Sequence, residues 1–371
     1  MQCVNRIGAL MLFACPAVLA AQKPDSTPPA AAPFATVSGS VTTSVTTSSN
    51  PSGKDIVGRL YGRRQNEPML NVVNVTLERV AATSKLDAGF RIEGWLGQNA
   101  RFVKSAGLDL GQNADIWQAY ASVNFPLSGE GRYLQIKAGK MATLMGIEVG
   151  EDVLNANLDV SWQDIYLEPF TETGMELDGK FGPHFDVELR VSNGWDQVKA
   201  VNAGKMFMAR LGLTPDDKTL IALVGCMGPE QANNTSNLRI AANVLLTRKV
   251  TSSATLSAQL DVGHEDGAAA AGGQARWYAA GAWLSYDVSS WATLALRGDF
   301  MDDHDGTRTS GVLGFPANTG QRIGSGTATL NIKKWTHVLV RPEVRYDRSD
   351  LEVFNGHSSQ MTVGLGLSLL F

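Results

Sequence analysis

The last eleven residues, 361–371, alternate between apolar side chains and small or polar ones. The apolar set occupies the odd positions Met361, Val363, Leu365, Leu367, Leu369 and Phe371. Successive side chains of a β-strand point to opposite faces, so this segment predicts a strand with one wholly apolar face. A tilted strand of about 9–11 residues is long enough to cross a bilayer. The pattern therefore predicts a strand that has lipid on one face and a lumen on the other.

Other segments repeat this alternation, with charged residues in mid-strand. In 184–193 and 336–347, apolar residues alternate with Asp, Glu and Arg, which a soluble core would exclude and a wet lumen would solvate. Segment 114–126 alternates likewise and places Trp117 on the apolar face. Pro342 has no N–H to donate within its strand, and a local bulge is expected there.

The connections between the predicted strands alternate in length along the whole chain. Short connections rest on turn residues such as Gly182-Pro183. Long ones fall at 48–68, 98–113, 141–171, 194–203, 228–236, 264–272, 304–321 and 348–358. Outer-membrane barrels have short periplasmic turns and long external loops. Residues 34–371 are therefore predicted to form an all-β, closed, antiparallel up-and-down barrel of about sixteen membrane-spanning strands, closed by pairing of 34–47 with the last strand.

Aromatic residues concentrate near the ends of the predicted strands. Their amphipathic rings suit the level of lipid headgroups, so two aromatic girdles are expected. The girdle at the short turns would contain Phe125, Tyr133, Phe181, Phe185, Trp291, Trp335 and Phe371, and the girdle at the long loops Trp95, Trp195 and Tyr346.

The N-terminal segment has the features of a secretory signal. Residues 1–20 combine Arg6, an apolar stretch and small residues before Ala21, and 21–33 is a Pro- and Ala-rich tether without strand pattern. Export through the periplasm to the outer membrane of a Gram-negative-type bacterium is predicted. The sequence around Cys15 resembles a lipoprotein signal, so lipidation of Cys15 stays open. Beyond residue 33, Cys226 has no second cysteine with which to form an intramolecular disulfide.

Four short segments resemble one family of membrane barrels. They are 134–148, which contains Gly139-Lys140-Met141 and Met145-Gly146-Ile147-Glu148; 168–174, which reads EPFTETG; 296–300, which reads LRGDF; and 340–347, which reads VRPEVRYD. These are similar to elements of the OmpL-like β-barrel porin-2 family, with Glu172 where His is frequent and Asp299 where Glu is usual. The resemblance covers most of the chain after the signal. It implies an outer-membrane pore for small solutes and no catalytic residues.

Charged residues on the predicted lumen side supply a candidate pore wall of both signs. It consists of Arg91, Glu93, Lys137, Arg190, Arg297, Asp299, Arg341, Glu343 and Arg345. A wall of mixed sign would hydrate a channel and give weak charge selectivity. The alternative is that these residues pair with one another and the aperture lies elsewhere.

The longest predicted connection, 141–171, is the candidate constriction. Its apolar residues, at 153–154 and 165–167, would be poorly solvated on the outside, and long loops in compact proteins are usually functional or mobile. Folding into the barrel would bury them and narrow the pore with acidic residues. The alternative is a loop that packs over the rim. The acidic residues concerned are Glu148, Glu151, Asp152, Asp159 and Asp164.

Other chemistries have weaker support. The Asp302–Asp305 segment offers oxygen ligands for Ca²⁺ but lacks the spacing of a recognised site, so a solvated acidic rim is expected, with no metal and no cofactor. None of the five histidines lies mid-strand beside a compelling nucleophile, so no enzyme is predicted. The net charge of −4 argues against a nucleic-acid partner.

The predicted function is passive diffusion of small hydrophilic solutes through a water-filled lumen of mixed charge. Outer-membrane lipid is the expected surrounding, and assembly as a homo-oligomer stays open. A closed structural or adhesive barrel is the first alternative. An outer-membrane hydrolase that uses a histidine is the second.

Overall fold

The computed structural model describes residues 34–51, 53, 55–269 and 272–371. The predicted signal peptide at 1–20, the tether at 21–33 and Cys15 lie outside the described residues.

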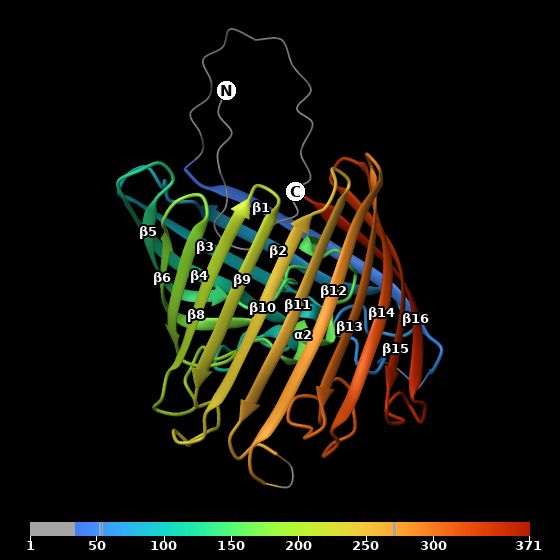
Figure 1. Cartoon of the computed structure of the whole chain (residues 1–371). Coiled ribbons are helices and arrows are strands. Elements are labelled where there is room, and N and C mark those ends of the chain that lie inside the picture. Colours follow the sequence, from blue (N-terminus) through green and yellow to red (C-terminus); the bar gives the residue numbers. More distant parts are fainter. Residues whose placement is uncertain (1–33, 52, 54, 270–271) are drawn as a thin grey trace.

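The described chain forms a closed antiparallel barrel of sixteen strands in which each strand pairs with its neighbours in sequence (Figure 1). The predicted fold class is thereby confirmed. The strands are β1 (Thr36–Ser48), β2 (Met69–Arg79), β3 (Asp87–Leu96), β4 (Ala114–Pro126), β5 (Tyr133–Ala142), β6 (Thr171–Lys180), β7 (Phe185–Ser192), β8 (Met206–Asp216), β9 (Thr219–Gly228), β10 (Arg239–Lys249), β11 (Ala254–Glu265), β12 (Ala275–Ser289), β13 (Ala292–Asp303), β14 (Gln321–Trp335), β15 (Val338–Ser349) and β16 (Ser359–Leu370).

Pairing of the first strand with the last closes the barrel. Ser40 lies opposite Leu370, Val45 opposite Leu365, and the register is unbroken between them. The remaining strand pairs are likewise antiparallel. The predicted closure is therefore confirmed.

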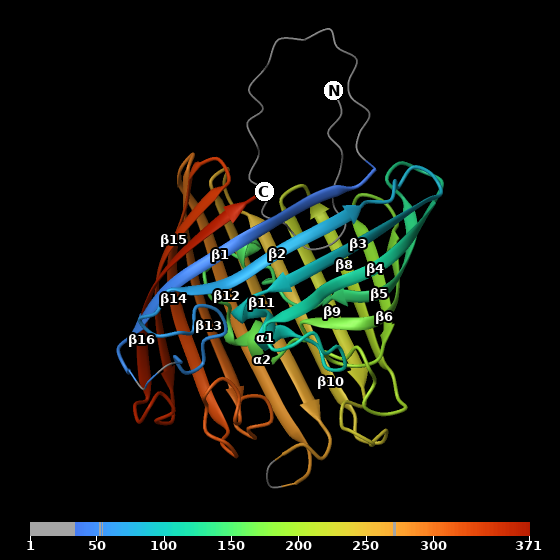
Figure 2. The ribbon, with the colours of Figure 1, turned by 180° about the vertical axis from the view of Figure 1, so that it is seen from behind.

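All the long connections leave the barrel at one end, and the short turns lie at the other end together with the C-terminus (Figures 1 and 2). We call these the long-loop end and the short-turn end. In the part of the chain that the structure describes, the long connections carry three short helical segments, α1 (Gln98–Val103), η1 (Asp152–Leu154) and α2 (Trp162–Tyr166). No helix in the described ranges has the length and apolar character needed to span a membrane.

The two faces of β16 differ as the alternation predicts. Met361, Val363, Leu365, Leu367 and Leu369 are each 47–50% exposed on the outside of the barrel. The intervening side chains point inward and are buried. An apolar outer band and a polar inner face are the pattern of a barrel that sits in lipid.

The side on which Trp117 lies was predicted wrongly. Glu93 pairs with Gln118 while the next residue of β3, Gly94, pairs with Ile116, so Trp117 is an extra residue in β4. Beyond such a bulge, the residues that would have pointed outward point into the barrel, and the reverse. Trp117 therefore points into the barrel, where it is buried.

The bulge expected at Pro342 is absent. Pro342 pairs with Leu365 within an unbroken register against β16, and the register against β14 is the same on both sides of it. The missing N–H thus removes one donor without adding a residue to the strand.

The predicted aromatic girdles are confirmed only in part. At the short-turn end, Phe125, Phe181, Phe185, Trp291, Trp335 and Phe371 are exposed, as is Tyr346 toward the long loops. Tyr133, Trp95 and Trp195 are buried instead. Trp95 stacks on Trp117 at a centroid distance of 4.4 Å and donates its indole N–H to Glu93 at 2.7 Å, so polar partners and ring stacking hold it inside.

A charge placed on the outer face should destabilise the barrel according to its depth. Leu365→Lys, near the middle of β16, should lower the free energy of unfolding by about 2–4 kcal/mol. Met361→Lys, on the same face near the long-loop end, should cost about 0–1 kcal/mol. Denaturant titration of the protein in lipid vesicles measures both, and equal costs would contradict a lipid-facing β16.

Candidate functional site

The connection between β5 and β6, residues 143–170, lies inside the barrel, and we call it the inner loop. Its α2 segment is seen within the ring of strands in opposite views (Figures 1 and 2). The Ile147 N–H donates to Gln259 on β11 at 2.9 Å, and the Trp162 N–H donates to Asp299 on β13 at 2.8 Å. The inner loop therefore crosses the lumen from the β5–β6 side to the opposite wall.

Arg297, on β13, holds the inner loop through several groups at once. Its guanidinium pairs with Glu148 at 2.8 Å and with Asp299 at 3.2 Å. It also donates to the backbone carbonyls of Asp159 at 2.7 Å and Val160 at 3.1 Å. A buried guanidinium has five N–H donors to satisfy, and the inner loop supplies acceptors for them.

Two arginines of β15 act in the same way. Arg345 pairs with Asp347 at 2.7 Å and with Asp159 at 3.2 Å. Arg341 donates to the backbone carbonyl of Asp152 at 2.7 Å and pairs with the Asp152 carboxylate at 3.4 Å. Both ends of the segment 152–159 are thus fixed to one strand.

Glu343 and Arg59 complete this anchored side. Glu343 accepts the Leu158 N–H at 2.6 Å and the Thr329 hydroxyl at 2.8 Å. Arg59, from the connection between β1 and β2, pairs with Glu343 at 3.2 Å and with Asp159 at 3.6 Å. A second long connection therefore reaches inward and ties the inner loop to the wall.

Five of the predicted pore-wall residues therefore face the inner loop and do not face an open lumen. They are Arg297, Asp299, Arg341, Glu343 and Arg345, and each makes at least one hydrogen bond to the inner loop. The prediction of a solvent-lined wall on β13 and β15 differs from the structure, because the carboxylates and carbonyls of the inner loop occupy the guanidinium donors. The alternative of paired residues with an aperture elsewhere fits these five.

The acidic residues predicted to narrow the pore point away from free solvent. Glu148, Asp152 and Asp159 are buried against the arginines of β13 and β15, and Asp164 is also buried. Burial raises the pKa of Asp152 and of Asp164 above the ordinary range. The inner loop therefore presents little free negative charge to a solute.

Glu151 lies on the other side of the inner loop, near β3. Arg91 pairs with Glu93 at 2.6 Å and with Glu151 at 3.4 Å. Burial raises the pKa of Glu151 to about 8, with a further rise from the nearby Glu93 carboxylate and an opposing effect of Arg91. This residue is thus a second anchor, on the opposite flank of the inner loop.

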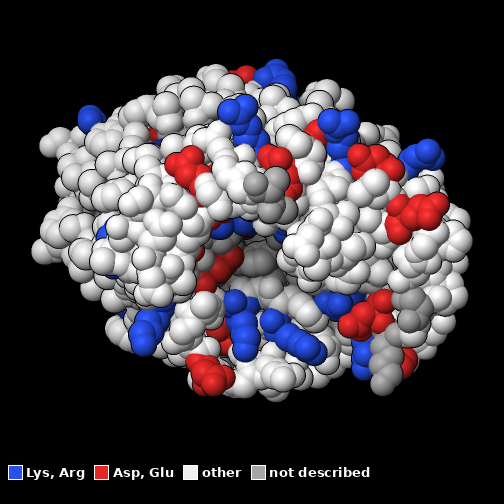
Figure 3. All heavy atoms as spheres, turned by 90° about the horizontal axis from the view of Figure 1, so that it is seen from below, with Lys and Arg blue, Asp and Glu red and all other residues white. Residues whose placement is uncertain are grey.

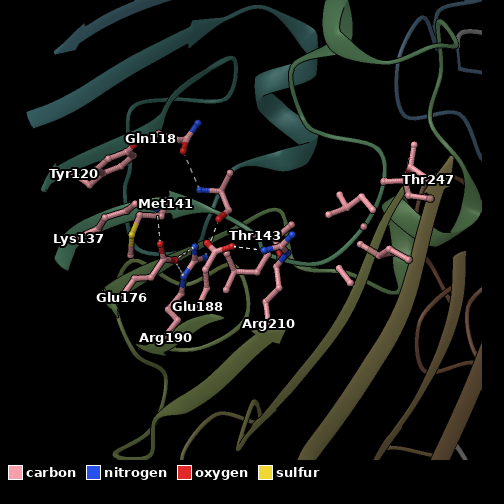
Figure 4. Close-up of a pocket in the computed structure, with 17 residues that line it drawn as sticks. Gln118, Tyr120, Lys137, Met141, Thr143, Glu176, Glu188, Arg190, Arg210 and Thr247 are labelled. Carbon is pink, nitrogen blue, oxygen red and sulfur yellow. Dashed lines mark hydrogen bonds and ion pairs between the residues drawn. The ribbon is translucent and has the colours of Figure 1, made fainter. Parts of the chain in front are cut away.

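A ladder of alternating charges runs across the inner faces of β5–β8 (Figure 4). Lys137 pairs with Glu176 at 2.7 Å, Arg190 donates to Glu176 at 2.8 Å, and Arg210 pairs with Glu188 at 2.8 Å. We call these five residues the charge ladder. Lys137 and Arg190 were among the predicted pore-wall residues, and the block of β5–β8 brings them together.

A cavity of about 110 Å³ separates the charge ladder from the inner loop and from β9 and β10. Gln118 and Tyr120 of β4 join the ladder on one side. Viewed from the long-loop end, the molecule is hollowed at its centre, and acidic and basic atoms line the hollow (Figure 3). The side formed by the inner loop, β9 and β10 is largely apolar and contributes Leu144, Ile147, Leu220, Ala222 and Leu245, with Thr247 as a polar member.

Sequence reasoning missed this apolar side. Strands β8–β10 carry apolar residues on both faces, as in 219–228, which reads TLIALVGCMG. That departure from alternation was the available signal. No comparable signal marks Arg59, whose role depends on an inward fold of the connection between β1 and β2.

The acidic segment Asp302–Asp305 is no solvated rim, contrary to expectation. Asp303 is buried and accepts the N–H groups of Arg308 at 3.0 Å and Thr309 at 2.8 Å, and Asp302 pairs with Arg322 at 2.6 Å. These carboxylates organise the connection between β13 and β14. Within the described ranges, no cluster of His, Cys, Asp and Glu is arranged to hold a metal ion.

A closed sixteen-stranded barrel with an apolar outer band and a long loop folded inside is the architecture of an outer-membrane porin. The chain belongs to the family described as Putative beta-barrel porin-2, OmpL-like, whose model matches residues 35–371. The resemblance seen in the sequence is confirmed. No match was found among curated proteins.

Solved structures share the fold at low sequence identity. The outer membrane channel DcaP of Acinetobacter baumannii is 12% identical, with a TM-score of 0.61 over 91% of this chain and 97% of that one. An anion-selective porin from Comamonas acidovorans is 10% identical, with a TM-score of 0.62 over 91% and 99%. The trimer form of OmpT from Vibrio cholerae is 9% identical, with a TM-score of 0.58 over 91% and 99%.

Removal of Arg297 should loosen the inner loop. Arg297→Met leaves Glu148 and Asp299 buried without their partner. Breaking a buried ion pair in this way typically lowers the free energy of unfolding by about 3–5 kcal/mol. The double variant Arg297→Met with Glu148→Gln should recover part of the lost free energy of unfolding. Arg248→Met breaks an exposed pair with Asp216 and should cost less than about 1 kcal/mol. Denaturant unfolding compares the three, and an Arg297 variant as stable as the Arg248 control would contradict the anchoring role.

Proposed function

We propose that this porin allows passive diffusion of small hydrophilic solutes along the β4–β10 side of the lumen. The cavity between the charge ladder and the inner loop is the observation that carries the proposal. On the other side of the lumen, the inner loop is anchored to β13 and β15. The wall of mixed sign would keep water in the path and would favour neither cations nor anions strongly.

Residues proposed to line the path are the charge ladder with Gln118 and Tyr120. The predicted pore-wall members Arg91 and Glu93 flank it on β3, where Glu151 of the inner loop meets them. In this proposal Glu148, Glu151, Asp152, Asp159 and Asp164 narrow the lumen by fixing the loop in place, and their charges are neutralised by arginines or by burial.

The surroundings proposed for the protein follow from its outer face. Exposed leucines and valines on β16 and the exposed aromatic rings at the short-turn end suit contact with outer-membrane lipid. Delivery by a signal peptide through the periplasm would place the short turns on the periplasmic side. A homo-oligomer is consistent with the trimer form named for the Vibrio cholerae relative.

An enzymatic role has little support from the histidines. His304 is exposed and contacts Asp302 and Asp305 at the long-loop end. His184 contacts the Thr214 carbonyl beside a short turn, and His337 occupies a positive-φ position in the turn between β14 and β15. These positions lie at the ends of the barrel, away from the cavity.

Single-channel recording in planar bilayers tests the proposal. Purified, folded protein should give stable ohmic steps, with a reversal potential near zero in a KCl gradient. Glu188→Gln removes one negative member of the charge ladder and should shift the reversal potential toward that of chloride, while Glu352→Gln, on an exposed loop, should not. Folded protein that gives no conductance would favour the closed structural barrel.

A further inference from the structure

The lumen has an apolar side, which is unusual for a water-filled barrel. Inward-facing residues of porin strands are generally polar. On β8–β10, however, the buried inward side chains are mostly apolar, with Thr219, Asn243 and Thr247 as polar members. The apolar members are Met206, Met208, Ala222, Val224, Cys226, Ala241 and Leu245.

Met145 of the inner loop packs onto this apolar side. Its side chain is 0% exposed, and its sulfur lies 4.0 Å from the sulfur of Cys226. The neighbouring Leu144 belongs to the same buried apolar cluster and also lines the cavity with Leu245. The contact between the inner loop and β8–β10 is therefore an apolar seal, which we define as Leu144 and Met145 with Ala222, Cys226 and Leu245.

The charge ladder faces the cavity from the opposite wall (Figure 4). It presents ammonium, guanidinium and carboxylate groups in alternation. A solute that carries one positive and one negative group can interact with neighbouring members of both signs. A solute with a single charge meets as much repulsion as attraction along the same wall.

We propose that the passage is selective for small zwitterionic organic solutes with an apolar side group, that Leu144 and Leu245, which line the cavity, determine this specificity, and that the fully buried Met145 positions Leu144. The inference rests on the proposed pore function. Charged groups of the solute would travel along the charge ladder while its apolar group contacts Leu144 and Leu245, members of the apolar seal at the cavity wall. Hydrated inorganic ions gain nothing from that seal, because an apolar constriction opposes the passage of water and of hydrated charge.

Swelling of liposomes that contain the full protein tests the preference with a matched pair of solutes. Leucine and asparagine have nearly equal mass and the same two backbone charges, and differ in whether the side chain is apolar or polar. Leucine should enter about threefold faster or more, after subtraction of the rate in protein-free liposomes. Met145→Gln, which is similar in length but polar, should abolish the difference and raise KCl conductance by about threefold or more.

Met301→Gln is the matched control for this substitution. Met301 is equally buried in the same apolar cluster, on β13, the strand that holds the anchored part of the inner loop. The Met301→Gln variant should therefore keep the preference for leucine over asparagine and the KCl conductance of the unaltered protein. Leu245→Asn, from the opposite side of the apolar seal, should reproduce the effect of Met145→Gln and serves if that variant fails to fold.

The outcomes separate the inference from the function on which it rests. Equal entry of leucine and asparagine into liposomes whose porin conducts KCl would overturn the proposed selectivity and leave the pore intact. Equal effects of the Met145 and Met301 variants would show that Met145 serves packing alone. Absence of both swelling and conductance would overturn the pore itself.

Discussion

The interior of this barrel depends on guanidinium groups that are buried and must be paired. A charged group removed from water is costly unless hydrogen bonds and opposite charges replace the water. Arg297, Arg341 and Arg345 project from β13 and β15. The inner loop supplies a carboxylate or carbonyl partner to each of them, in addition to Asp299 and Asp347 on the same strands. One consequence is that the inner loop occupies the lumen beside β13 and β15. Another is that the cavity lies beside β4–β10, away from these three arginines.

The small residues on the inner face of β16 belong to the same arrangement. Leu158 of the inner loop packs on Gly364 and Gly366, and a Cβ at Gly366 would lie 2.5 Å from a methyl of Leu158. The alternation in 361–371 thus reflects two contacts, one with lipid and one with the inner loop. Its large residues meet lipid, and its small ones leave space for the loop that Arg341 and Glu343 hold in place.

The sequence predicts the barrel well because lipid and lumen impose a period of two on strands, while connection lengths distinguish the two ends. The prediction failed at Trp117, because a single extra residue in β4 reverses the alternation. It also failed at Trp95, whose ring stacks on Trp117 and donates to Glu93 inside the barrel. At the site, the charged residues were identified from alternation. Whether Arg345 faces water or the inner loop depends on long-range contacts such as that with Asp159, which no local pattern reveals.

Accessibility of single cysteines during conductance recording tests most directly which side of the lumen is open. In a Cys226→Ala background, Thr247→Cys on β10 lines the cavity, whereas Thr327→Cys on β14 lies beneath the inner loop beside Arg297. A charged, thiol-reactive methanethiosulfonate reagent should reduce the conductance of the Thr247→Cys channel and leave the Thr327→Cys channel unchanged. Block of the Thr327→Cys channel alone would contradict the account.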